Sequence, residues 1–133
     1  MAAFAGAPFA WGKHDCVRLA AHALRGLGYK PRLSRAGRYS TALGAMKALK
    51  RTGFACIEDA LDDLGLARLP WTYALPGDVV ALPSGQEMRA LGVVISHAHV
   101  LAFSPFDGLC SLATPSADDI VQLWSAPPCL KPR

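Results

Sequence analysis

The first half of the chain carries apolar residues at the spacing of buried helix faces. Between residues 14 and 28, apolar side chains recur every three or four positions, at Val17, Ala20, Ala21, Leu24 and Leu27. This spacing predicts an amphipathic helix. We expect it to end near Gly28, because glycine is common just after the last helical turn.

Two further helices are predicted before residue 66. In "STALGAMKALKRTG", Ser40 suits the N-cap and Gly53 the end, and the buried stripe is expected at Leu43, Met46 and Leu49. In "CIEDALDDLG", acidic residues lie near the start, where the helix dipole favours them. The helical part should therefore cover about residues 14–66.

From residue 70 the pattern changes to short apolar runs rich in β-branched residues. The runs are "VVAL" after a Pro-Gly turn, "ALGVVIS", "HVLAF", "GLCSLAT" and "DIVQLWSA", and each has the length of a strand. Asp78 is expected to fix the turn before the first run, and Trp124 to be buried in the last. The pattern predicts one α+β domain over residues 1–133. Helices should pack on an antiparallel sheet of four to five strands within about residues 70–126, followed by an irregular tail at 127–133.

The composition is that of a folded globular domain. Hydrophobic residues make up 52% of the 133 residues and charged residues 18%, which is enough to build one buried core. No apolar run approaches the ~18 residues that span a bilayer, and the apolar first residues have no basic leader segment. We therefore expect no signal peptide, no membrane partner and synthesis in the cytosol.

The net charge of +4 is distributed unevenly along the chain. Residues 1–53 contain ten Lys and Arg side chains and a single acid, Asp15, whereas residues 54–133 contain four basic and nine acidic side chains. The basic half is either a solvated face or a surface that docks to an acidic partner. Nucleic acid is not expected as that partner, because the basic residues are not interleaved with aromatics and no groove-binding motif is present.

The four cysteines are widely spaced and contain no CxxC pair. No metal site, redox site or cofactor is therefore predicted, and three of the four are expected to be small core residues. Cys16 differs because it lies where the first predicted helix begins. Unpaired N–H groups and the positive end of the helix dipole favour a thiolate there. Cys16 is accordingly either a nucleophile with a lowered pKa or another core residue.

The order of motifs resembles that of the NlpC-type cell-wall peptidases, which belong to the papain-like cysteine hydrolases. The residues that carry the resemblance are Trp11, Gly12, Asp15 and Cys16, then Pro76, Gly77 and Asp78, then Gly92. More narrowly, the chain is similar to a compact family encoded in phage and prophage tail modules. That family has the same Trp-Gly-x-x-Asp-Cys start, an Arg-x-Tyr-x-Thr-Ala segment, here within "GRYSTALGA", and an Ala-Leu-Gly strand.

The resemblance implies a set of site residues and also exposes a departure. Cys16 would be the nucleophile with Asp15 beside it, and the turn containing Trp11, Gly12 and His14 would contact the substrate. The peptidases place their catalytic histidine two residues before the glycine that corresponds to Gly92, and this chain has Ala90 there. The remaining candidates for the base, none of which is selected by the sequence, are His97, His99 and His14.

His97 and His99 would share one face of a strand. They could serve catalysis or simply lie in a surface turn, and a two-histidine pair without a third ligand predicts no metal site.

Two functions follow from the resemblance. In the first, Cys16 attacks a carbonyl of a cell-wall peptide and forms a thioester, while helix N–H groups stabilise the oxyanion. In the second, the chain is an inactive structural component of a phage tail tip and binds other tail proteins through its basic face. Either function implies assembly in the host cytoplasm and residence in the virion tail. A third alternative, a cytosolic binding module for a small molecule or metal, has no specific motif behind it.

Overall fold

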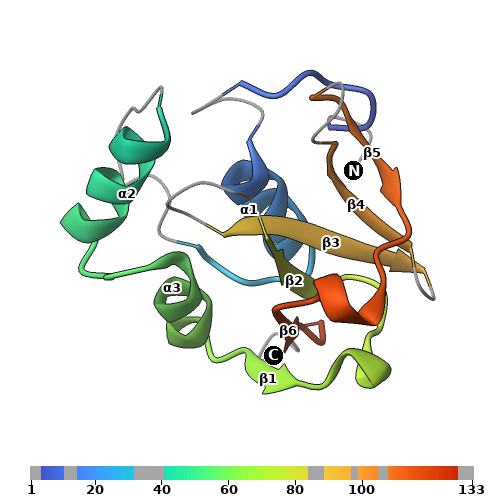
Figure 1. The fold of residues 1–133 in the computed structure, drawn as a ribbon. Coiled ribbons are helices and arrows are strands. Elements are labelled where there is room, and N and C mark those ends of the chain that lie inside the picture. Colours follow the sequence, from blue (N-terminus) through green and yellow to red (C-terminus); the bar gives the residue numbers. More distant parts are fainter. Residues whose placement is uncertain are drawn as a thin grey trace.

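The computed structural model of the chain describes residues 4–10, 15–31, 41–83, 89–96, 99–104 and 108–128. Within these ranges the fold is α+β, as the apolar pattern predicts, with three α-helices followed by six strands (Figure 1). The helices are α1 (Cys16–Gly26), α2 (Ala42–Arg51) and α3 (Ile57–Asp63). The strands are β1 (Ala67–Leu69), β2 (Val79–Leu82), β3 (Ala90–Ser96), β4 (His99–Phe103), β5 (Cys110–Ala113) and β6 (Gln122–Ser125).

All six described strands belong to one antiparallel sheet in the order β1-β6-β2-β3-β4-β5. The runs "ALGVVIS" and "HVLAF" form β3 and β4, which pair with each other. The expected count of four to five strands is wrong, because β1 was not predicted. This strand has three residues, two of them exposed, and it pairs only with β6 near the other end of the chain. No local pattern marks such a strand.

The helices cover one face of the sheet. Leu19 of α1 packs with Val93 of β3 and Leu101 of β4, and Figure 1 shows α1 against the sheet, with α2 and α3 beside it. A second core cluster joins all three helices to β2, β3 and β6, and its largest member, Trp124, is fully buried as predicted. These contacts place the start of α1 against the start of β3.

The opposite face of the sheet is covered by connections between strands. Val80, Val94 and Val100 are buried there. Trp71, in a 3₁₀ turn between β1 and β2, and Ile120, just before β6, pack against them. This explains why the β part is apolar on both faces although helices lie on only one.

The buried stripe of α2 agrees with the predicted one at Met46 and Leu49, which are partly buried against the core. It differs at Leu43, which is 56% exposed, and Ala45 and Ala48 are buried. Small side chains allow a helix to approach its neighbours closely. The alanine face of α2 therefore packs against the core. The helix is capped by Thr41, whose hydroxyl accepts a hydrogen bond from Gly44 N–H at 3.0 Å. The predicted cap, Ser40, lies outside the described residues.

The division into a helical and a β part is close to the predicted one. The three helices lie within residues 16–63 and the strands within residues 67–125, so the β part begins a few residues before the expected boundary near 70. Of the predicted irregular tail, Pro127 and Pro128 are described and belong to no helix or strand. Among the described helices, none has both the length and the apolar character needed to cross a bilayer.

Candidate functional site

Cys16 is the first residue of α1, as the sequence predicts. The preceding residue, Asp15, is the N-cap, and its carboxylate accepts a 2.8 Å hydrogen bond from the backbone N–H of Arg18. Asp15 is fully buried. A buried aspartate at this position satisfies one of the N–H groups that the first helical turn leaves unpaired. The local geometry that a nucleophile at a helix start requires is therefore present.

The environment of the Cys16 thiol agrees with the second of the two alternatives, a core residue. The side chain is 7% exposed, and burial raises its pKa from 9.0 to about 11. Backbone hydrogen bonds, chiefly with Leu91 of β3, act in the other direction, while the neighbouring Asp15 charge raises the pKa further. The pKa of Cys16 is therefore not lowered as the nucleophile alternative requires. The free-energy cost of removing the thiolate from water exceeds the stabilisation that the backbone N–H groups give it.

Leu91 connects Cys16 to the position where the resemblance implies a catalytic histidine. Ala90 is the first residue of β3 and directly precedes Leu91, whose backbone makes the hydrogen bond with the Cys16 thiol. The motif alignment therefore brings residue 90 close to Cys16, but the side chain at that position is a half-buried methyl group. A methyl group cannot accept a proton.

The described histidines lie away from Cys16. His99 is exposed at the start of β4, opposite Ser96 at the far end of β3, and its Nδ1 is 3.1 Å from the Ser96 hydroxyl. At ~3.3 Å per residue, the five positions from Leu91 to Ser96 span roughly 16 Å of strand. His22 is exposed on α1 and contacts the ring of Phe4. The structure does not bring either imidazole to the thiol.

Several predicted site residues lie outside the described ranges. These are Trp11, Gly12 and His14 before α1, and His97 between β3 and β4. Their roles stay predictions. Within the described ranges, no group of three or more His, Cys, Asp or Glu side chains could hold a metal ion.

Asp78 fixes the turn before β2, as predicted. Its carboxylate is 2% exposed and accepts hydrogen bonds from the backbone N–H groups of Leu75 and Ala126, each at 2.9 Å. Gly77 has a φ of +95°, a conformation that favours glycine, and donates its N–H to Val94 O at 2.7 Å. The Pro-Gly-Asp motif is therefore structural here. It sets the start of β2 and the position of the chain after β6.

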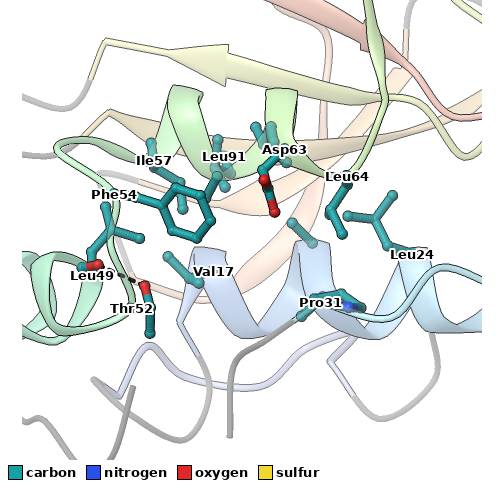
Figure 2. Close-up of a pocket in the computed structure, with 14 residues that line it drawn as sticks. Val17, Leu24, Pro31, Leu49, Thr52, Phe54, Ile57, Asp63, Leu64 and Leu91 are labelled. Carbon is teal, nitrogen blue, oxygen red and sulfur yellow. Dashed lines mark hydrogen bonds between the residues drawn. The ribbon is translucent and has the colours of Figure 1, made fainter. Parts of the chain in front are cut away.

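An apolar pocket of about 80 Å³ lies among the three helices (Figure 2). Its walls include Val17 and Ala20 of α1, Leu49 and Phe54 at and beyond the end of α2, and Ile57 and Ala60 of α3. Leu91 also lines the pocket, which therefore reaches the strand residue that contacts Cys16. The sequence did not predict this pocket, because it depends on how three helices meet rather than on any local motif.

Two polar side chains line the pocket. The Thr52 hydroxyl donates a 2.6 Å hydrogen bond to Leu49 O. The Asp63 carboxylate has no hydrogen-bond or ion-pair partner within the described part of the chain. Trp71 and Tyr73, between β1 and β2, do not line this pocket. Trp71 packs on the far face of the sheet, and Tyr73 is 64% exposed.

The chain belongs to the family described as a domain of unknown function (DUF6950), whose model matches residues 1–126. No curated protein and no solved structure gives a significant match.

Proposed function

We propose that this member of the DUF6950 family is a structural component of a phage tail tip, with an NlpC-type, papain-like framework that does not hydrolyse cell-wall peptides. The observation that carries the proposal is the burial of the Cys16 thiol, which is 7% exposed and has a pKa of about 11. A thiol with that pKa is ionised in about one molecule in ten thousand at pH 7. The thiolate is the nucleophile in this chemistry.

No histidine within the described residues lies at the Cys16 thiol. A general base must come within ~3 Å of the thiol, directly or through one water. Ala90 occupies the position from which the peptidases supply it, and His99 lies at the other end of β3. Cys16 then acts as a small core side chain that joins α1 to β3.

The assignment to a phage tail is supported by the motif order of the chain. The Trp-Gly-x-x-Asp-Cys start and the "GRYSTALGA" segment resemble the family found in tail modules. The basic half of the sequence supplies a surface for acidic neighbours: its exposed side chains include Arg25, Lys30, Lys47, Lys50 and Arg51. We infer that other tail proteins are the partners, and that the protein is assembled in the host cytoplasm and resides in the virion.

A cysteine peptidase is the second candidate. It is favoured by one observation, that Cys16 opens an 11-residue helix and contacts the strand that would carry the base. In that function Cys16 attacks the substrate, Asp15 caps the helix, and Trp11, Gly12 and His14 contact the peptide. His97 or His14 would then have to supply the base.

Incubation with purified cell-wall peptides distinguishes the two candidates. We expect no new amine or peptide product by mass spectrometry from the wild-type protein or from Cys16→Ala. Iodoacetamide at pH 7 should label Cys16 more slowly than the half-buried Cys56, because the Cys16 thiol is both inaccessible and protonated. Turnover by the wild type that is lost in Cys16→Ala would overturn the structural proposal.

Purified virions test the location. We expect mass spectrometry of particles from the strain that carries the gene to detect the protein, and Cys16→Ala to assemble into infectious particles at the wild-type level. Absence of the protein from the particles would refute the tail assignment. Loss of infectivity in Cys16→Ala with normal assembly would instead support the peptidase.

A further inference from the structure

The pocket among α1, α2 and α3 has the size of a small side chain or ligand. Its volume is about 80 Å³, and a water-sized group needs roughly 10–15 Å³ on this measure, so about six heavy atoms fit. We propose that it binds a protonated primary amine carried on a compact hydrocarbon group of about that size. This inference does not depend on the proposed function.

The walls of the pocket select for hydrocarbon. Figure 2 shows Val17 below, Phe54 and Ile57 on one side and Leu64 on the other, with their side chains directed towards a common space. Burial of apolar surface is the main favourable term for a neutral group that enters such a site. The Thr52 hydroxyl already donates its hydrogen to Leu49 O, so towards a ligand its oxygen can act only as an acceptor.

The charge at the mouth of the pocket selects for a cation. Asp63 is the last residue of α3, where the helix dipole is negative, and α3 has no basic residue in its last turn. The adjacent Asp62 is paired with Arg68 at 2.7 Å, whereas the Asp63 carboxylate has no partner among the described residues. A bound ammonium group would satisfy both the carboxylate and the end of the helix.

The basic residues of α2 do not remove the preference of the pocket for a cation. At the end of α2, Lys50 and Arg51 already lie in the last turn and oppose the negative end of that helix. Among the described residues that line the pocket, the charged one is Asp63 of α3. An anion of the same size would be repelled by Asp63, and a neutral analogue would gain only the apolar contacts.

The experiment is a titration of the full-length protein with 3-methylbutylamine, followed by methyl NMR. We expect shifts of the methyl groups of Val17, Ala60 and Leu64, and tighter binding of the amine than of 3-methylbutan-1-ol. The anion 3-methylbutanoate should bind more weakly than the alcohol. Equal affinities for the amine and the anion, or shifts confined to other residues, would overturn the proposal.

Two variants separate the charge from the cavity. Asp63→Asn should weaken binding of the amine about threefold to fivefold, the range of a partly exposed ion pair, and leave binding of the alcohol unchanged. Asp59→Asn, an exposed acid on the same helix that does not line the pocket, is the matched control and should have no effect.

Ala60→Leu should fill the pocket and abolish binding of the amine and the alcohol. Its melting temperature shows whether it folds, and if it does not, Asp63→Asn decides alone. Unchanged amine affinity in Asp63→Asn would refute the role of the carboxylate.

Discussion

The buried carboxylate of Asp78 accepts a 2.9 Å hydrogen bond from the backbone N–H of Ala126, 48 residues further along the chain. Its other oxygen accepts a 2.9 Å hydrogen bond from Leu75 N–H. One side chain therefore fixes the turn before β2 and also holds the segment that follows β6. Both partners are donors, so the position requires an acceptor at each oxygen.

Asp78→Asn should destabilise the fold because an amide has only one oxygen. Its NH₂ group would face an N–H donor and leave that buried group unsatisfied. We expect the free energy of unfolding in urea to fall by about 2 kcal/mol, within the usual range for such a loss. Asp118→Asn, exposed in a 3₁₀ turn, is the control and should change it by under about 0.5 kcal/mol. Equal effects in the two variants would contradict this role of Asp78.

Gly92 of β3 lies against residues of β4 with no room for a side chain. A Cβ atom at this position would be 2.5 Å from Cγ1 of Val100, which is fully buried. Gly92→Ala should therefore lower the free energy of unfolding by about 2 kcal/mol through overpacking.

The same change in a Val100→Ala background removes the closest contact. We expect Gly92→Ala to cost at least about 1 kcal/mol less there, which a double-mutant cycle by urea denaturation measures. Additive effects of the two substitutions would show that the clash does not govern the loss.

Asp62 joins α3 to β6 through the indole of Trp124. Its Oδ1 accepts hydrogen bonds from Trp124 Nε1 at 2.9 Å and from Arg68 Nε at 3.0 Å. Asp62→Leu would leave the indole N–H of a fully buried tryptophan without its acceptor, whereas Asp62→Asn keeps an oxygen for it. We expect Asp62→Leu to be less stable than Asp62→Asn by about 1–2 kcal/mol in thermal or urea unfolding.

The pH dependence isolates the charge of Asp62. Hydrogen bonds from Arg68 and Trp124 hold the pKa of this carboxyl below its usual value. Its contribution is therefore present above the unfolded-state pKa and is lost as the pH falls through the folded one. The stability difference between the wild type and Asp62→Asn should shrink towards zero between pH 5 and pH 2. A constant difference would rule out a contribution from the charge.

The class of fold and most of its elements could be predicted from the sequence. Periodic spacing marked α1, and the β-branched runs marked five of the six described strands, because these signals are local. β1 and the burial of Ala45 and Ala48 on α2 could not be predicted, since both depend on distant partners. The pairing of Ala67 with Ser125 leaves no trace near residue 67, and the burial of Ala45 rather than Leu43 depends on what packs against α2.

The position of the candidate site could be predicted from the sequence, but the pKa of its cysteine could not. Asp15 and Cys16 lie at the start of α1 as expected, because capping is a local property. The pKa of Cys16 depends on how completely other elements exclude water, and Leu91 and Trp124 come from strands far away in sequence. The helical pocket was missed for the same reason.

Alkaline pH tests the environment of Cys16. Its pKa is raised from 9.0 to about 11 in the fold, so the native chain holds the proton more tightly than the unfolded chain does. The contribution to stability is complete below pH 9 and is lost as the pH rises through 11. At about 1.4 kcal/mol per pKa unit, the loss of unfolding free energy amounts to about 3 kcal/mol.

Burial also raises the pKa of Cys110, so the informative quantity is the difference in unfolding free energy between the wild type and Cys16→Ala. That difference should move by about 2 kcal/mol in favour of the variant between pH 8 and pH 11. A movement in the opposite direction at lower pH, between 6 and 9, would instead reveal a thiolate stabilised by the fold.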